Sequence, residues 1–259
     1  MQQTELKKLA TDQLDYFTED GHKVYQSQWR EQTFRIPEEI LRDDEPFTVL
    51  DVGGANGRFS DRLLEEYPQA RAVVLDNSEY LLEQNRPHER KGLVLGSATE
   101  MPTCLEGQHF DFIFVNCLLH HIVTNRYSQT RALIAGVLND LADRLTERGR
   151  LSIWENIFEG FVWPNWPGRA IFEITSIEKL AVLAKKLGAN TAGVGVCFLS
   201  REQWRKELEA AGLKILDTGW QSMQLPLYQR LPLTIGTTGA THMWCAKSER
   251  SQNSAKDLL

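Results

Sequence analysis

Short apolar runs that end in glycine or a polar residue alternate with amphipathic segments through the middle of the chain. From Ile134 to Leu145, apolar side chains recur every three or four positions, which predicts a long helix ending before Gly149. Shorter helices are expected at 58–68 and 78–87. Strand and helix alternating in this way predict a parallel sheet with helices on both faces. The buried strands are expected at residues 47–53, 70–76, 92–96, 110–116 and 150–155.

Two segments fall outside this alternation. About residues 4–33 have a helical pattern before the first strand. A second helical run, at about 169–187, follows an aromatic, proline-rich stretch after the fifth strand. Segments placed in this way usually cover the carboxyl edge of the sheet, where open α/β folds bind ligands.

The C-terminal part completes the expected organisation. Ser200 and Gln203 have the spacing of a capping box for a helix through Ala211, and closing strands are expected at 214–220 and 241–247. We expect an α/β fold: a Rossmann-like, doubly wound, mostly parallel sheet with a C-terminal antiparallel strand pair and helical lid segments. The expected division is an N-terminal helical lid (1–44), a core (45–247) with a helical insertion at about 160–199, and a disordered tail (248–259).

Composition narrows the classes of protein that fit. The 259 residues are 42% hydrophobic and 25% charged, as in an ordinary globular domain, and the net charge of −6 argues against a general nucleic-acid binder. No apolar run has the length of a membrane span, no signal-peptide core is present, and the four cysteines read as separate thiols. We expect a cytoplasmic protein without nucleic-acid or membrane partners. The sequence does not decide between a monomer and a homodimer.

The stretch VLDVGGANGRF (49–59) places small residues where the first strand turns into a helix. Gly53 and Gly57 allow the positive φ angles and the close backbone approach that a ligand-binding turn needs, and Ala55 between them is also small. Their G-x-A-x-G spacing differs from the dinucleotide pattern G-x-G-x-x-G, and the residues after Gly57 do not complete a P-loop. A structural turn without a ligand is the alternative.

Two acids accompany this loop. Asp51 lies just before it, where a carboxylate would repel a diphosphate and attract a ligand with a cationic amine or sulfonium. Asp76 ends the second strand, where an acid can accept hydrogen bonds from two ribose hydroxyls. Because nicotinamide-binding folds share the second acid, Asp51 is the residue that favours a positively charged adenosyl ligand.

With these features, residues 45–155 resemble the class I S-adenosyl-L-methionine-dependent methyltransferases. The motif VLDVGGANG is similar to the family's D/E-x-G-x-G-x-G, with Ala55 at the middle glycine. The resemblance implies S-adenosyl-L-methionine as the cofactor, its methionine part held by the first loop and its ribose by Asp76. The residues that it assigns to the cofactor are Asp51, Gly53, Gly54, Ala55, Gly57, Asp76, Asn77, Ser97, Ala98 and Asn116.

Two later motifs extend the resemblance. LGSATEMP (95–102) resembles the loop that frames the adenine, with Ser97 where the family often has an acid. This implies that the Ser97 hydroxyl or backbone groups recognise adenine. FDFIFVNCLLHHIV (110–123) resembles the motif whose strand end lies against the transferred methyl group, and small-molecule members carry a similar LHH. Asn77 is also more polar than the residue often found after the ribose acid.

His120 and His121 are the candidate catalytic residues. Adjacent side chains point in different directions, so one of the two is expected to face the site. An imidazole there can take a proton from an attacking hydroxyl or amine, and packing or helix capping is the alternative. Glu155, at the same edge, is expected either to orient a substrate or to be solvated. No metal site is expected from the histidine pair.

Aromatic residues near the expected lid segments are candidates for a wall around the acceptor. Packing in an ordinary core is the alternative for each. A wall of this kind would favour an aromatic or otherwise apolar small molecule as the acceptor. The candidates are Tyr16, Tyr25, Trp29, Phe161, Trp163 and Trp166.

The expected function is methyl transfer from S-adenosyl-L-methionine to a small molecule, at oxygen, nitrogen or carbon, in biosynthesis such as secondary metabolism. Three alternatives stay open. One is an enzyme that binds the same cofactor but catalyses a rearrangement or cyclisation. The others are a nicotinamide-dependent oxidoreductase and a non-catalytic protein that senses the cofactor.

Overall fold

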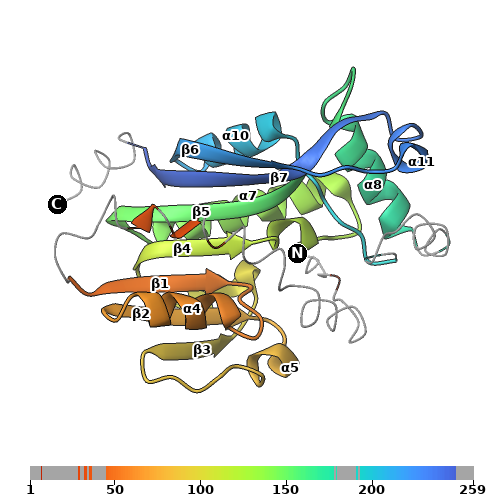
Figure 1. Cartoon of the computed structure of the whole chain (residues 1–259). Helices are drawn as coiled ribbons and strands as arrows, with labels where there is room; N and C mark the ends of the chain where they lie inside the picture. The colour runs from red at the N-terminus through yellow and green to blue at the C-terminus, as the bar shows by residue number, and fades with distance from the viewer. Residues whose placement is uncertain are drawn as a thin grey trace.

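One seven-stranded sheet organises the chain. The computed structural model describes residues 7, 29, 32–33, 35–36, 45–177, 179, 191 and 193–248. Within them the strand order is β3-β2-β1-β4-β5-β7-β6 (Figure 1). Neighbouring strands are parallel except at β7, which is antiparallel to both β5 and β6. This arrangement confirms the expected α/β fold.

Helices and strands alternate from β1 to β5, and the antiparallel strands follow. The strands are β1 (Phe47–Val52), β2 (Ala70–Asp76), β3 (Lys91–Leu95), β4 (Phe110–Asn116), β5 (Leu145–Gly160), β6 (Leu213–Ser222) and β7 (Ile235–Lys247). The helices are α4 (Arg58–Glu66), α5 (Glu79–Leu82), α6 (Met101–Cys104), α7 (Tyr127–Asp143), α8 (Trp166–Ser176), α10 (Arg201–Ala210) and α11 (Leu227–Arg230). Two 3-10 turns are η1 (Ala98–Glu100) and η2 (Leu119–His121).

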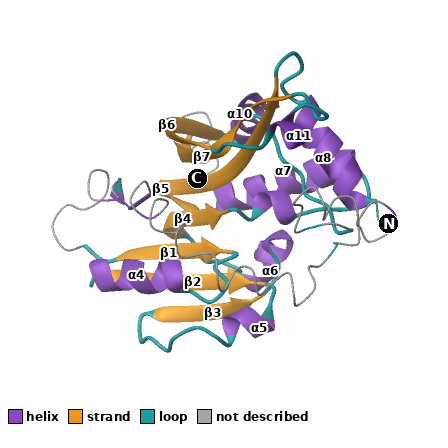
Figure 2. Cartoon of the chain, turned by 45° about the vertical axis from the view of Figure 1, so that its right-hand side comes forward, coloured by secondary structure: helices purple, strands orange, loops and turns teal. Residues whose placement is uncertain are grey.

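The central strands are buried on both faces, which explains their nearly continuous apolar runs. Along β1, Val49 packs in a cluster with residues of α4, and Leu50 packs in a second cluster with residues of α7 and α10. Figure 2 shows α4 on one side of the sheet and α7 on the other. Trp29 and Ile36 join the α4 cluster, so this part of the N-terminal region packs on the sheet layer.

Several boundaries differ from the prediction. Helix α5 spans only Glu79–Leu82, so the helix expected at 78–87 ends five residues early. Strand β5 runs to Gly160 because its end pairs with the start of β7, a contact between distant segments that gives no local apolar run. The expected helix at 169–187 is observed as α8, and most of its second half lies outside the described residues.

Helix α10 begins at the predicted capping box. The Ser200 hydroxyl accepts from the Gln203 amide, and the Gln203 side chain accepts from the Ser200 amide. None of the helices in the described part of the chain is long and apolar enough to cross a bilayer.

Candidate cofactor and acceptor site

The connection from β1 to α4 is a tight turn with three residues in the left-handed region. The φ angles of Gly53, Ala55 and Gly57 are 69°, 47° and 71°. The Gly53 amide donates to the Leu75 carbonyl oxygen at 2.7 Å, which ties the turn to β2. A Cβ at Gly57 would lie 1.8 Å from Asn85 Oδ1, so this position has neither the φ nor the space for a larger residue.

Asn85 holds the turn from the outside. Its Nδ2 donates to the carbonyl oxygens of Ala55, at 2.9 Å, and Leu82, at 3.1 Å. No pattern in the sequence points to Asn85, because its role depends on a contact across thirty positions of the chain.

Asp76 joins the first turn to the second. Its Oδ2 accepts from the Ala55 amide and its Oδ1 from the Ser78 amide, both at 2.9 Å. Burial raises the pKa of this carboxyl, and the backbone hydrogen bonds oppose the shift. Each oxygen keeps a further lone pair for a ligand hydroxyl, as the ribose assignment requires. The neighbouring Asn77 is exposed.

Asp51 lies beneath the turn. The side chain accepts from the Ser60 hydroxyl at 2.8 Å, and the residue is 1% exposed. Gly54 covers it, because a Cβ there would lie 2.7 Å from Asp51 Oδ2. Burial raises the pKa of this carboxyl to about 7, and the hydrogen bond from Ser60 opposes the shift. In this structure Asp51 therefore has no open face on the outer side of the turn.

The third connection leaves β3. The Ser97 hydroxyl accepts from the Thr99 amide at 3.2 Å and caps η1, while Ala98 is buried. The Gly96 amide donates to the Asp76 carbonyl oxygen at 2.9 Å, which places this connection beside the second turn. The Ser97 side chain thus has a structural partner, and recognition of adenine by backbone groups fits this geometry better.

The end of β4 lies against the glycine turn. Val52 pairs with Val115, so Asn116, the last residue of β4, lies beside Gly53, the first residue after β1. A Cβ at Gly53 would lie 2.8 Å from Leu118 Cδ1, which shows how closely the two connections pack.

Gln32 reaches the same place from the N-terminal region. Its Nε2 donates to Asn116 Oδ1 at 2.6 Å, and the side chain is fully buried. Its Oε1 has no hydrogen-bond partner among the described residues. A buried acceptor without a donor is unfavourable, and its position beside Asn116 suits a ligand that carries a donor group.

His120 and Glu155 form a buried pair. His120 Nδ1 lies 2.5 Å from Glu155 Oε2, and Glu155 Oε1 accepts from the Leu119 amide at 2.8 Å. Both residues are buried. The carboxylate fixes the imidazole through Nδ1 and leaves Nε2 as the ring nitrogen that can accept a proton. Of the two roles expected for Glu155, solvation is therefore wrong.

His121 has a different environment. Its ring centroid lies 4.1 Å from that of His120. Burial and the neighbouring imidazole hold the pKa of His121 well below its usual value, so this ring stays neutral.

Two aromatic residues lie beside His120 that no pattern in the sequence indicates. The Phe198 ring lies 5.0 Å from the His120 ring and 4.5 Å from the Phe158 ring, and both phenylalanines are half-buried. Phe158 belongs to the unexpected extension of β5, and Phe198 precedes the capping box of α10. They offer an apolar surface next to the imidazole.

The prediction of an aromatic wall around the acceptor is mostly wrong. Trp163 and Trp166 are 69% and 48% exposed, and Phe161 is 67% exposed, because the connection after β5 projects outward. Trp29 is buried in the core, with its ring 5.1 Å from that of Phe59. Tyr16 and Tyr25 lie outside the described residues.

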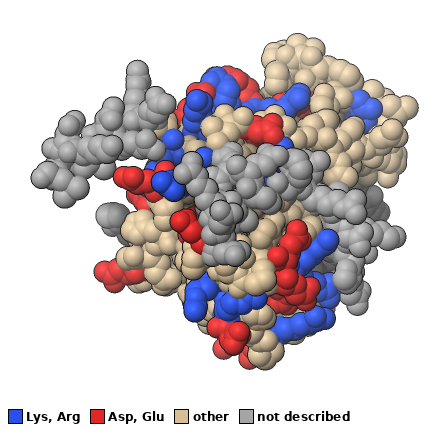
Figure 3. Space-filling model, turned by 60° about the vertical axis from the view of Figure 1, so that its left-hand side comes forward, with Lys and Arg blue, Asp and Glu red and all other residues tan. Residues whose placement is uncertain are grey.

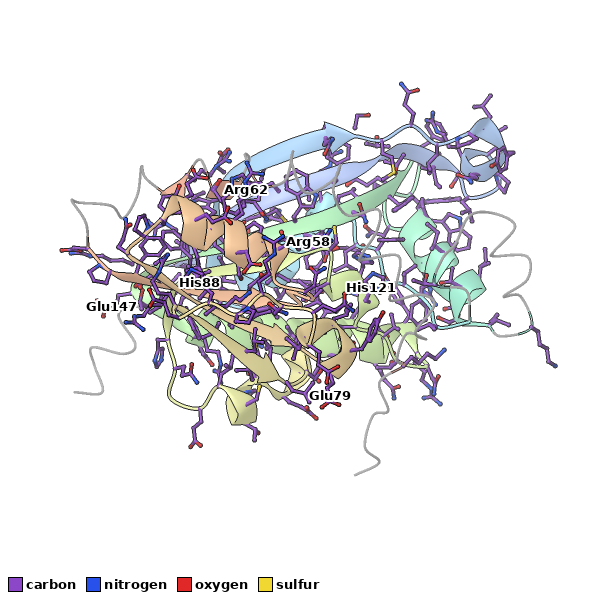
Figure 4. The ribbon with its side chains drawn as sticks, turned by 60° about the horizontal axis from the view of Figure 1, so that its bottom comes forward. Arg58, Arg62, Glu79, His88, His121 and Glu147 are labelled. Atoms are coloured by element: carbon purple, nitrogen blue, oxygen red, sulfur yellow. The ribbon has the colours of Figure 1, made fainter. Side chains whose placement is uncertain are left out.

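Figure 4 shows how the connections converge. Arg58, Glu79 and His121 follow β1, β2 and β4, and they lie toward the same end of the sheet. His88, which precedes β3, and Glu147, at the start of β5, lie toward the opposite end. Glycine turn, ribose acid and histidines therefore share the carboxyl edge of the parallel strands.

Comparison with protein families agrees with this geometry. Residues 49–140 match the family model described as a methyltransferase domain. These residues form a class I S-adenosyl-L-methionine-dependent methyltransferase domain. The match covers β1 through most of α7, which includes the glycine turn, Asp76 and the histidine pair. It supports S-adenosyl-L-methionine as the cofactor of this domain.

One curated relative matches a shorter segment. It is the malonyl-[acyl-carrier protein] O-methyltransferase of Methylococcus capsulatus, 36% identical over 75 residues. The matched segment is 27% of this chain and 26% of that protein, so the likeness spans about a quarter of the relative.

Solved structures share the fold of the methyltransferase domain at low identity. A putative sarcosine dimethylglycine methyltransferase from Galdieria sulphuraria has a TM-score of 0.59 at 15% identity, over 87% of this chain and 86% of that one. The [4+2]-cyclase SpnF has a TM-score of 0.57 at 14% identity, over 84% of this chain and 80% of that one. LepI in complex with SAM has a TM-score of 0.54 at 14% identity, over 84% of this chain and 47% of that one.

Asp51→Asn tests the buried carboxyl. Because the folded pKa of about 7 lies above the ordinary value of 3.8, the wild-type free energy of unfolding should fall as pH rises between these values. The side-chain amide of the variant cannot ionise, so that part of the pH dependence should vanish. The stability of the variant relative to the wild type should therefore increase as the pH rises towards 7. Urea unfolding across this pH range measures the difference, and parallel curves for the two proteins would contradict the assignment.

Ala55→Gly tests the strain of the turn. An alanine in the left-handed region is disfavoured, so glycine should raise the free energy of unfolding by about 0.5–1 kcal/mol. The matched control is Ala132→Gly, an exposed position inside α7, which should lower it by about 1 kcal/mol. Urea denaturation of both variants provides the comparison. A loss at both positions would show that Ala55 is not strained.

Proposed function

We propose that the chain transfers the methyl group of S-adenosyl-L-methionine to an oxygen atom of a small, partly apolar acceptor, with His120 as the general base. The observation that carries this proposal is the buried His120–Glu155 pair, 2.5 Å between Nδ1 and Oε2, on the connection that packs against the glycine turn. An orienting carboxylate behind an imidazole is an arrangement suited to proton abstraction.

The described residues fit the cofactor in three respects. Asp76 keeps lone pairs for the ribose hydroxyls, and the left-handed turn at Gly53 and Ala55 permits close approach to its backbone. Gln32 Oε1 is a buried acceptor without a donor among the described residues, suited to the ammonium group of the methionine part. The negative charge of Asp51 beneath the turn complements a ligand with positive charges on that side.

The remaining assigned residues have supporting roles. Asn116 orients the Gln32 amide, and the exposed Asn77 follows the ribose acid. We assign the frame of the adenine to the backbone at Ser97 and Ala98. Gly54 and Gly57 serve by fitting where a side chain would collide.

Catalysis rests on position and proton transfer. When bound, S-adenosyl-L-methionine would supply an activated methyl group to the acceptor oxygen and would leave as S-adenosylhomocysteine. His120 Nε2 accepts the proton that the acceptor hydroxyl loses. Glu155 stabilises the resulting imidazolium through Nδ1–H, and the Leu119 amide holds Glu155 in place. Correct placement of the acceptor alone can contribute ~7–11 kcal/mol.

The N-terminal region is proposed to act as a lid, with the core beginning near residue 45. Lys7 donates through its amide to the Val123 carbonyl oxygen and through Nζ to the Ser176 carbonyl oxygen, both at 3.3 Å. It therefore links the connection after η2 with α8. Phe158 and Phe198 would form the apolar side of the acceptor pocket, in the place first expected for tryptophans.

The proposed roles of the two histidines and of Glu155 are tested with three variants: His120→Ala, Glu155→Gln and His121→Asn. The purified chain is incubated with S-adenosyl-L-methionine and a panel of phenols, keto acids, amines and a malonyl thioester, the last chosen from the name of the curated relative. Formation of S-adenosylhomocysteine and of the methylated product is measured by mass spectrometry. With a phenol or alcohol acceptor, His120→Ala should lower kcat by about 10²–10⁴-fold, with Glu155→Gln intermediate and His121→Asn changed only a few-fold.

Cofactor affinity distinguishes a lost base from a lost fold. The three variants should bind S-adenosyl-L-methionine nearly as the wild type does. Full activity of His120→Ala would contradict the base assignment, since an acceptor already ionised needs no base. If an acceptor is converted and no S-adenosylhomocysteine forms, the reaction is a rearrangement or cyclisation and not methyl transfer.

A further inference from the structure

Two connections meet at the end of the long ribbon formed by β5 and β7. The first follows β5 at Phe161, and the second joins β6 to β7 through α11 (Figure 2). The Phe161 amide donates to the Thr234 carbonyl oxygen at 3.1 Å, so the two connections touch. Together they expose six large apolar side chains, each between 61% and 74% accessible. These six, called the apolar tip, are Phe161, Val162, Trp163, Leu227, Tyr228 and Leu231.

The backbone of the apolar tip is built to hold these side chains outward. The Trp166 amide donates to the Trp163 carbonyl oxygen at 3.0 Å, and Thr234 donates likewise to Leu231 at 3.1 Å. The Arg230 guanidinium donates to the Gly236 carbonyl oxygen at 2.9 Å. A connection fixed in this way does not fold its apolar side chains back into the protein. Contiguous exposed apolar surface of this kind usually marks a binding surface.

The two connections that form the apolar tip contain no acidic residue. No Asp or Glu occurs between Glu159 and Glu173 or between Asp217 and Glu249, although the whole chain has 35 acidic residues and a net charge of −6. Arg169 and Arg230 lie within these stretches. Arg169 forms an exposed ion pair with Glu173 at 3.9 Å, whereas no carboxylate of the described residues pairs with Arg230. Figure 3 shows a mostly uncharged area at the upper right, at the height of these connections in Figure 1. This surface therefore complements an apolar partner with negative charge.

We infer that the apolar tip docks on the surface of an anionic lipid bilayer. Tryptophan, tyrosine, phenylalanine and leucine side chains are favoured at the boundary between lipid head groups and hydrocarbon, and arginine adds attraction to anionic lipids. The tip is also a projection formed by two connections, which suits insertion into a fluid surface. The residues that would enter the bilayer are those of the tip, and no helix of the described residues crosses it.

The position of the tip gives docking a consequence for the site. The end of β5 lies at the carboxyl edge of the parallel strands, the edge that carries the glycine turn and His120. A bilayer against the tip would therefore lie on the acceptor side of the molecule. This part of the inference rests on the proposed function, and it favours an amphiphilic acceptor taken from the lipid surface.

Vesicle sedimentation with the full chain tests the docking. The chain should pellet with vesicles of phosphatidylcholine mixed with phosphatidylglycerol, and more weakly with phosphatidylcholine alone. The triple variant Trp163→Ser, Leu227→Ser, Leu231→Ser should lose binding by about tenfold or more. Arg169→Glu should weaken binding to the anionic vesicles several-fold and make it less sensitive to salt. Leu93→Ser, a 46% exposed leucine on β3, is the matched control and should bind as the wild type does.

Two further measurements keep the result clear. Thermal unfolding and binding of S-adenosyl-L-methionine should be unchanged in the triple variant, because its side chains lie outside the core and the cofactor site. Absence of wild-type binding to both vesicles, or equal binding by the triple variant, would overturn the inference while leaving the methyltransferase proposal intact. A wild type that is dimeric by light scattering, monomeric as the triple variant and unable to bind vesicles would assign the tip to a second copy instead.

Discussion

The left-handed turn between β1 and α4 is the constraint on which the site depends. Three residues within five positions have a positive φ, a conformation that few residue types adopt easily. The turn therefore needs contacts from outside to keep its shape. Partners from elsewhere in the chain fix the shape: Asp76 at the end of β2, Asn85 after α5 and Leu118 after β4. The turn therefore joins three segments at one edge of the sheet.

In our proposal, a buried charge gives this edge its selectivity for the ligand. Asp51 is covered by Gly54 and satisfied by one hydroxyl, so its ionised form is disfavoured until a positive group approaches. A pyrophosphate would add repulsion to that burial, whereas a sulfonium and an ammonium would offset it. The second buried acid, Glu155, lies farther along the edge, where a backbone amide and an imidazole partner it. The two carboxylates divide the edge into a proposed cofactor side and a proposed acceptor side.

The sequence was sufficient for the sheet and for the residues at its edge, because those signals are local. Apolar runs locate the five parallel strands, and the glycine turn and Asp76 follow directly from strand ends. It was insufficient for partners that meet only in the folded chain: Gln32 reaches Asn116 across 84 positions, and His120 reaches Glu155 across 35. The aromatic residues show the same limit. The sequence marked Trp29 and Trp163 as candidates for a wall around the acceptor. In the folded chain Trp29 is buried in the core and Trp163 is exposed, and only tertiary packing decides this difference.

The most direct test of this account is calorimetric titration of the full chain with S-adenosyl-L-methionine and with NAD, at about pH 6 and about pH 8, alongside Asp51→Asn. The account predicts binding of S-adenosyl-L-methionine only. Its affinity should be higher at the upper pH, where Asp51 is ionised, and that difference should be smaller in the variant. Binding of NAD at the turn, or the same pH dependence in both proteins, would contradict the claim that a buried negative charge selects the ligand.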